Sequence, residues 1–134
     1  MRHVPKRVCV DTHALIWHLS KPAKLGRRAK RVFGAVEAGT TEALIPAMVL
    51  VELLLLRAAG RRVIPAREVA ELFGRTSFRL LPLDLGQALE FAGLEAIRDP
   101  FDRLIVCAAR CERVPLVCAD SSIHDLGVVD TIWD

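Results

Sequence analysis

Short apolar runs alternate along the chain with longer segments in which apolar residues recur every three or four positions. The short runs predict β-strands, and the longer amphipathic segments predict helices between them. We expect strands at 7–10, 42–46, 77–83, 114–119 and 128–133, and helices at 12–19, 24–39, 47–59, 65–75, 84–97 and 101–112. The sequence contains no repeat, low-complexity segment or interdomain linker, which predicts a single domain over residues 1–134.

Strands that alternate with helices pair in parallel through right-handed crossovers. The expected architecture is therefore a three-layer α/β/α domain with a central parallel sheet of about five strands. In such a sheet the functional crevice lies beyond the carboxyl ends of the strands. Two expected strands end there in an aspartate, Asp11 after VCV and Asp120 after VCA. Either aspartate also fits the role of a helix N-cap, which leaves its carboxylate pointing out of the sheet's end.

Glu52 is the only charged residue in the segment AMVLVELLLL. The helix predicted at 47–59 is apolar nearly all round, and we expect it to be buried. An ionised carboxylate in that setting is costly unless a cation or strong hydrogen-bond donors meet it. The structural alternatives are that Glu52 pairs with an arginine or faces solvent at a thin edge.

The stretch RDPFDRLIVCAA places two acids at the start of an apolar helix. Asp99 precedes Pro100 and is a well-formed N-cap. Asp102 falls at the third helical position, where the helix dipole favours an acid without requiring one. Arg103 would orient a carboxylate, contact a phosphate or lie on the surface. Asp102 is therefore the acid that is free to do chemistry.

Four carboxylates from distant segments would repel one another if they met without a counterion. They are Asp11, Glu52, Asp102 and Asp120. Carboxylate oxygens without neighbouring Cys or His ligands favour Mg²⁺ or Mn²⁺ over zinc. Such a site suits phosphodiester hydrolysis, because the metal ion activates water and neutralises charge on the phosphate. The sequence shows no catalytic triad pattern or nucleophile elbow.

Composition adds a weak indication of a polyanionic partner. The net charge is only +3, but basic residues without interleaved acids cluster at 24–31 and 57–62. A solvated helix face and a loop would explain these clusters equally well. Aromatic residues make up 5% of the chain, which argues against a surface that binds single strands mainly by stacking.

The sequence also predicts a cytoplasmic protein without a membrane partner. Asp11 and His13 interrupt the apolar part of the N-terminal segment, which is therefore a poor signal peptide. The longest apolar run, 44–56, is too short to span a bilayer. Cysteines of a cytoplasmic protein are expected to be free thiols. We expect the four cysteines of this chain to be buried as small apolar residues, because their spacing does not match a zinc site. They are Cys9, Cys107, Cys111 and Cys118.

The segments VCVDTHALIWHL, the helix with Glu52, RDPFDRLIVCAA and PLVCAD follow one another in an order that resembles the PIN-domain family. The resemblance is specifically to VapC-type toxin ribonucleases of toxin–antitoxin pairs, and it covers essentially the whole chain. It implies a five-stranded parallel sheet flanked by helices and a metal-dependent endoribonuclease that cleaves RNA. Family members often carry Ser or Thr before the last acid, in the region where this chain has Cys118.

Matched by motif, the resemblance assigns catalytic and metal-binding roles to Asp11, Glu52, Asp102 and Asp120. It makes Asp11 and Asp102 the principal ligands of Mg²⁺ or Mn²⁺, and Asp99 an accessory acid at most. It also implies a small antitoxin partner and a homodimer. The two basic clusters become candidate contacts to the RNA backbone.

Two other classes remain open at this point. An aspartate-based phosphohydrolase also places Asp after the first strand, but it needs a second Asp where this chain has His13, and a late lysine, whereas Lys30 is the last one here. A PIN-like protein-interaction module would use its acids only as helix caps. Within the nuclease class, the sequence does not decide between RNA and DNA.

Overall fold

The computed structural model describes residues 3–75 and 77–134, which contain a five-stranded sheet. The strands are β1 (Arg7–Val10), β2 (Glu42–Pro46), β3 (Phe78–Leu81), β4 (Leu116–Val117) and β5 (Thr131–Ile132). They lie in the order β3-β2-β1-β4-β5, and every neighbouring pair is parallel. The predicted parallel sheet is therefore confirmed.

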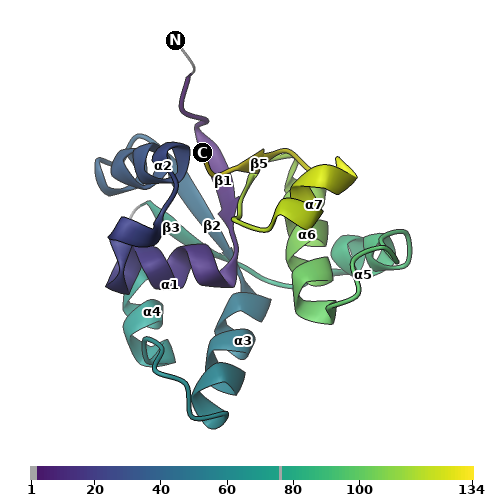
Figure 1. Cartoon of the computed structure of the whole chain (residues 1–134), viewed down its shortest axis with the longest axis horizontal. Helices are drawn as coiled ribbons and strands as arrows, with labels where there is room; N and C mark the ends of the chain where they lie inside the picture. The colour runs from purple at the N-terminus through teal and green to yellow at the C-terminus, as the bar shows by residue number, and fades with distance from the viewer. Residues whose placement is uncertain (1–2, 76) are drawn as a thin grey trace.

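Helices flank the sheet, and α3 continues from the end of β2 and extends away from the sheet (Figure 1). The helices are α1 (Thr12–Ser20), α2 (Arg27–Glu37), α3 (Ala47–Ala58), α4 (Ala66–Leu72), α5 (Leu85–Phe91), α6 (Pro100–Glu112) and α7 (Ser121–Leu126), with a 3-10 turn η1 (Pro22–Lys24). Within the ranges described, no helix is long and apolar enough to cross a membrane.

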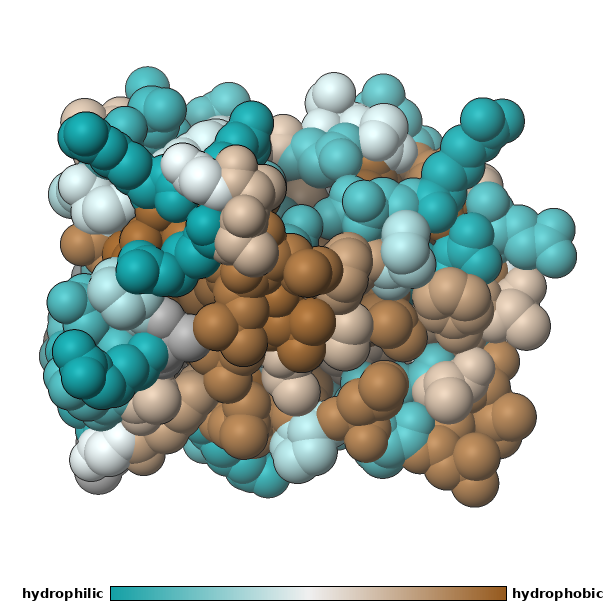
Figure 2. Space-filling view, turned by 90° about the horizontal axis from the view of Figure 1, so that it is seen from below, coloured by the Kyte–Doolittle hydropathy of each residue, from teal (hydrophilic) through white to brown (hydrophobic). Residues whose placement is uncertain are grey.

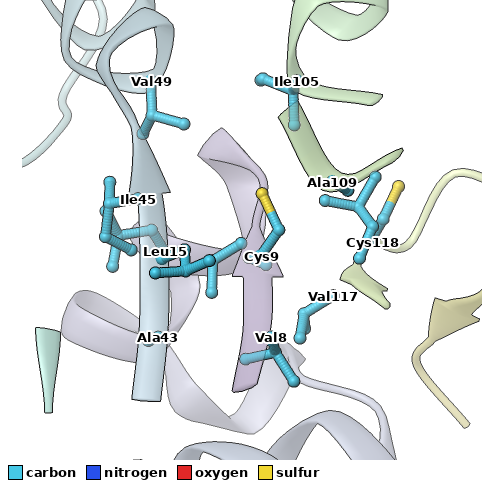
Figure 3. Packing of buried hydrophobic residues seen from close by; sticks show 14 of the residues in the cluster. Val8, Cys9, Leu15, Ala43, Ile45, Val49, Ile105, Ala109, Val117 and Cys118 are labelled. Atoms are coloured by element: carbon cyan, nitrogen blue, oxygen red, sulfur yellow. The ribbon is translucent and has the colours of Figure 1, made fainter. Parts of the chain in front are cut away.

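Both faces of the central strand are covered. Val8, Cys9 and Val10 follow one another in β1, so their side chains point to alternate faces, yet all three are fully buried. Figure 3 shows Val8 and Cys9 among apolar side chains from the neighbouring strands, from α1 and from α6. Burial on both faces explains why β1 reads as a continuous apolar run.

Three predicted helices are shorter than expected, among them the one expected at 65–75, which covers Ala66–Leu72. The helix expected at 84–97 ends at Phe91, because the amides of Gly93 and Leu94 donate to carbonyls three residues back and begin tight turns. Glycine favours such an ending, since it is a poor helix former. The helix expected at 24–39 begins only at Arg27, after η1. A six-residue helix that we did not predict, α7, follows Asp120.

Three strands pair over fewer residues than predicted. The segment 77–83 pairs over Phe78–Leu81, and the segments 114–119 and 128–133 pair over only two residues each. Their flanking residues retain the apolar pattern of a strand while packing as loops. Hydrogen bonding to a neighbouring strand, which the pattern does not encode, decides these boundaries.

The expectation that the helix bearing Glu52 is buried all round is wrong. Val49 and Leu53 of α3 are fully buried, but Val51, Leu54 and Leu55 are 41%, 54% and 51% exposed. Figure 2 views the molecule from the side toward which α3 projects, and apolar side chains gather over the middle of that face. The apolar pattern of α3 thus exceeds what the domain's own core covers.

The cysteines are free thiols, as expected. Cys9, Cys107 and Cys118 are buried, whereas Cys111 is partly exposed. Burial raises the pKa of the Cys107 thiol to about 11, so this group stays protonated at neutral pH.

The start of α2 lies against the last strand. The Ala29 amide donates to the Trp133 carbonyl at 3.0 Å. A Cβ atom at Gly26, the N-cap of α2, would lie 2.3 Å from the same carbonyl oxygen and 2.7 Å from the Asp134 side chain. Only glycine permits this approach of the two backbones.

We expect Gly26→Ala to lower the free energy of unfolding by about 1–3 kcal/mol, because the added methyl group must push the last strand away. Gly34→Ala is the matched control on the same helix, since a Cβ there meets nothing within 4 Å. Alanine at an open helical position is expected to raise stability by about 0.5–1 kcal/mol. Urea unfolding of both variants measures the difference, and equal effects would contradict the packing described.

Candidate active site

Asp11 and Asp120 lie at the carboxyl ends of neighbouring strands. β1 pairs with β4 through Val10 and Val117, and the Asp11 amide donates to the Val117 carbonyl at 3.2 Å. β1 is also where the chain order of the sheet reverses, with β2 on one side and β4 on the other. Ligands of α/β domains bind at such a switch point.

Both aspartates cap the helices that follow them. The Asp11 carboxylate accepts the Ala14 amide at 2.9 Å, and burial raises its pKa to about 6. The Asp120 carboxylate accepts the hydroxyl of Ser122 at 2.5 Å and its amide at 2.8 Å. The hydroxyl contact is the main reason why the pKa of Asp120 lies below its usual value. The predicted caps are confirmed, and the two carboxylates differ in how readily they ionise.

Glu52 reaches this edge from α3. Its carboxylate accepts a hydrogen bond from the Thr12 hydroxyl, which is almost fully buried at the start of α1. No ion pair in the described ranges joins Glu52 to an arginine, so that structural explanation of Glu52 is not supported. The negative charge of Glu52 contributes to the raised pKa of Asp11.

Asp102 is the acid that the other acids affect most. Partial burial raises its pKa to about 7, and repulsion by other carboxylates adds to the shift. Those carboxylates belong to Asp99, Glu52, Asp11 and Asp120. The structure therefore brings the four predicted site acids close enough to influence one another.

Asp99 and Arg103 have structural roles beside the site. Asp99 caps α6, since its carboxylate accepts the Asp102 amide at 3.0 Å. The Arg103 side chain donates to the Ile97 carbonyl at 2.7 Å, and its guanidinium lies 4.4 Å from the centre of the Phe91 ring. Arg103 thus fixes the turns between α5 and α6, and none of the ion pairs found in the described residues joins it to a site acid.

The model of one protein family matches the chain over residues 8–129, and its description is the PIN domain. The chain belongs to the PIN-domain family. The matched range contains all four site acids, Asp11, Glu52, Asp102 and Asp120. None of the curated protein sequences compared with the chain matches it.

Solved structures share the fold of this PIN domain. VapBC2 from Rickettsia felis, bound to a DNA fragment from its promoter, has a TM-score of 0.72 at 15% identity, covering 96% of this chain and 99% of that one. FitAcB from Neisseria gonorrhoeae has a TM-score of 0.64 at 15% sequence identity, and the match covers 93% of this chain and 96% of that one. A toxin–antitoxin complex from Klebsiella pneumoniae has a TM-score of 0.57 at 20% sequence identity, and the match covers 85% of this chain and 87% of that one. At these identities the similarity establishes the fold.

The donor chemistry of the PIN domain's site fits a hard divalent cation. All four acids offer carboxylate oxygens, which Mg²⁺ and Mn²⁺ prefer. As the side chains stand in the described residues, no three His, Cys, Asp or Glu groups form an arrangement that could hold a metal ion. Burial raises the pKa of Asp102 and repulsion by the other acids adds to it; a cation would offset that repulsion, provided that the carboxylates move closer together.

Members of the two basic clusters line separate hollows on the surface. Arg61 and Arg62 line a hollow of about 520 Å³ together with His13 of α1. Arg28 lines a second hollow, of about 260 Å³, together with Asp120 and His124. Of the two clusters, the one at 24–31 thus shares a hollow with a site acid, Asp120.

Sequence reasoning missed two residues of this site. The Thr12 hydroxyl donates to Glu52, and the Cys118 sulfur accepts the Asp120 amide at 3.3 Å. Each adjoins an acid in the sequence, Thr12 directly after Asp11 and Cys118 two positions before Asp120. That adjacency is the signal in the sequence, but a small residue beside an acid is more often an ordinary core residue.

We expect Asp102→Asn to stabilise the metal-free protein at neutral and alkaline pH. In the folded protein the Asp102 carboxyl keeps its proton up to about pH 7. In the unfolded chain it loses the proton near the usual aspartate pKa of about 4. The native state therefore binds more protons in this window, and wild-type stability falls as the pH rises through it. Solvent screening of the partly exposed group limits the expected gain to about 1–2 kcal/mol.

Urea unfolding in EDTA at pH 8 and pH 4.5 measures this gain. We expect the free energy of unfolding of Asp102→Asn to exceed that of the wild type at pH 8 and to approach it at pH 4.5. Asp125→Asn, which removes an exposed acid of α7, serves as the control and should change little. A gain that does not depend on pH would show that Asp102 is not held in a repulsive environment.

Proposed function

We propose that this PIN domain is a metal-dependent endoribonuclease that hydrolyses RNA phosphodiester bonds at its acidic edge. The observation that carries the proposal is that four acids from separate segments, Asp11, Glu52, Asp102 and Asp120, lie near enough at one edge of the sheet for their charges to act on one another. One acid suffices to cap a helix, and four neighbouring acids destabilise a fold unless a cation binds between them.

The residues divide the work according to their surroundings. Asp11 and Asp102 are the principal ligands, and their raised pKa values allow the metal-free site to keep protons that a cation would displace. Glu52, held by Thr12, and Asp120, held by Ser122, complete the site directly or through water. Bound Mg²⁺ or Mn²⁺ would activate water and neutralise charge on the scissile phosphate.

The basic clusters support RNA as the substrate. Arg28 shares a hollow with Asp120 and is placed to neutralise a phosphate of a strand that crosses the acids, while Arg61 and Arg62 line a separate hollow with His13. Phosphate contacts of this kind give affinity that falls with salt and carries no sequence information. They also offset the repulsion between a polyanion and the carboxylates.

We also propose that the protein is the toxin of a toxin–antitoxin pair. A structure from Klebsiella pneumoniae that shares its fold is a toxin–antitoxin complex. A small antitoxin that covers the exposed face of α3, with Leu54 and Leu55, would lie beside Glu52 and could close the site.

A second copy of the chain is the proposed partner for α5. Leu85 and Leu89 lie one helical turn apart on α5 and are 73% and 70% exposed. In Figure 1, α5 lies at the far side of α6 from α3. Pairing through α5 would therefore bury these leucines and leave the acidic edge open to RNA.

We expect the wild-type protein, freed of any antitoxin, to cleave a labelled single-stranded RNA pool at low salt with Mg²⁺ or Mn²⁺. EDTA should abolish cleavage, and Asp11→Asn should reduce it by at least about a hundredfold, since metal-ion stabilisation is worth several kcal/mol. Asp125→Asn should cleave like the wild type. A DNA pool of the same sequence tests the choice of nucleic acid.

Cleavage that Asp11→Asn retains would indicate a contaminating nuclease. A folded wild-type protein that cleaves neither pool with either metal would favour the protein-interaction module. Cleavage of DNA alone would overturn RNA as the substrate and keep the acidic site.

We expect the wild type to behave as a dimer in light scattering coupled to gel filtration, and Leu85→Glu with Leu89→Glu to yield monomers. The added charges cannot be buried at an apolar interface. Leu126→Glu, at an exposed leucine of α7, is the control and should remain dimeric. A monomeric wild type at micromolar concentration would contradict the pairing.

A further inference from the structure

The hollow of about 260 Å³ beside Asp120 continues the acidic edge onto the neighbouring surface. Its lining includes a cation, an aromatic ring and a further carboxylate, which belong to Arg28, Trp133 and Asp134. Pockets for drug-sized ligands measure roughly 300–1,000 Å³, so this hollow suits a smaller group such as one nucleotide base. Because Asp120 belongs both to the hollow and to the proposed site, a ribonucleotide bound by the site acids can extend into the hollow.

Contacts within the fold hold the lining side chains in place. The Trp133 ring packs against Trp17 of α1, with the ring centroids 5.7 Å apart, and the Trp133 carbonyl accepts the Ala29 amide of α2. Two more lining residues, His124 of α7 and Thr131 of β5, hydrogen-bond to each other at 2.6 Å. Trp133 is nevertheless partly exposed, so part of its ring is free to stack on an unpaired base.

The Asp134 carboxylate lies against the start of α2. Its Oδ1 would be only 2.7 Å from a Cβ atom at Gly26, the N-cap of that helix. Within the part of the chain that the structure describes, no side-chain hydrogen bond or ion pair involves this carboxylate. The Ala29 amide at this helix start donates to the Trp133 carbonyl instead. Helix capping therefore does not explain the acid, and its oxygens can accept from a ligand.

We propose that this hollow is a subsite that binds an unpaired guanine next to the scissile phosphate. The inference rests on the proposed nuclease function and names its substrate preference. Asp134 accepts the N1–H and N2–H groups of the guanine, Trp133 stacks on its ring, and Arg28 neutralises the phosphate of the same nucleotide.

Guanine is the base whose edge best matches a carboxylate. Its N1–H and N2–H groups are neighbours, so both oxygens of Asp134 can accept at once. In adenine, cytosine and uracil each donor stands beside an acceptor, whose lone pair would face the carboxylate and repel it. The phosphate is common to all nucleotides, so Arg28 adds affinity without adding preference.

Binding of nucleoside monophosphates in EDTA is the first test, because it needs no metal ion and no cleavage. The chain has two tryptophans, and Trp17→Phe assigns their indole N–H signals in a nitrogen-15 NMR spectrum. We expect GMP to shift the Trp133 signal with an affinity about tenfold or more above that of AMP, CMP or UMP. IMP lacks the N2 amino group and should bind about tenfold more weakly than GMP, as is typical for one hydrogen bond to a charged group.

Two acids near the end of the chain separate the subsite from general charge. Asp134→Ala should remove the preference for GMP over IMP. Asp130→Ala removes an exposed acid that does not line the hollow, and this variant should keep the preference.

Cleavage of the RNA pool with Mg²⁺ is the second test. The sequenced ends should carry guanine at one fixed position beside the cut. Replacing that guanine by inosine should lower kcat/KM about tenfold in the wild type and leave it unchanged in Asp134→Ala. Arg28→Ala should slow cleavage of both RNAs alike and make it less dependent on salt.

The outcomes distinguish this inference from the proposed function. No binding of GMP, equal binding of the four nucleotides, a preference that Asp134→Ala retains, or cuts without guanine beside them would overturn the subsite and leave the nuclease in place. A protein that binds GMP selectively through Asp134 but cleaves no RNA would keep the subsite and overturn the nuclease. A preference for another base would overturn guanine as the ligand.

Discussion

Repulsion between carboxylates is the constraint on which this PIN domain is organised. Partial burial raises the pKa of Asp102 to about 7, and the charges of the other site acids add to the shift. The domain tolerates this cost because the rest of the sheet is apolar and closely covered, with β1 buried on both faces. Stability given up at a functional site and offset by the core is a common trade-off in natural proteins.

Helix starts make the concentration of charge possible. Asp11 and Asp120 are N-caps, and Asp102 stands at the third position of a helix capped by Asp99. The amides at a helix N-terminus carry partial positive charge, which favours carboxylates. The chain thus uses one local device, the strand-to-helix turn, both to begin its helices and to direct acids beyond the sheet. At Asp120 the hydrogen bonds of the helix start lower the pKa of the carboxyl group. At Asp11, which is more buried, burial outweighs the same kind of hydrogen bond and raises the pKa.

Local patterns predicted the elements better than their extents. The strands 7–10 and 42–46 have the expected bounds because buried runs between turn signals leave little choice. The bounds of β4 and β5 depend on pairing with distant residues, which no local pattern contains. For the site, unusual acids at strand ends and in an apolar helix were visible in the sequence. The contacts of Thr12 and Cys118 could not be predicted from the sequence, because the role of a small residue depends on which side chains the fold places beside it.

The pairing of β1 with β4 joins Cys9 to Leu116 and Val10 to Val117, residues separated by most of the chain. Contacts so distant in sequence form late in folding, since a large loop must close before they form. During synthesis, β1, β2 and β3 can associate before β4 leaves the ribosome, and of the other site acids only Glu52 of α3 is then available to Asp11. The acidic edge is therefore assembled last, and a partly made chain would have most of its sheet without yet having the site.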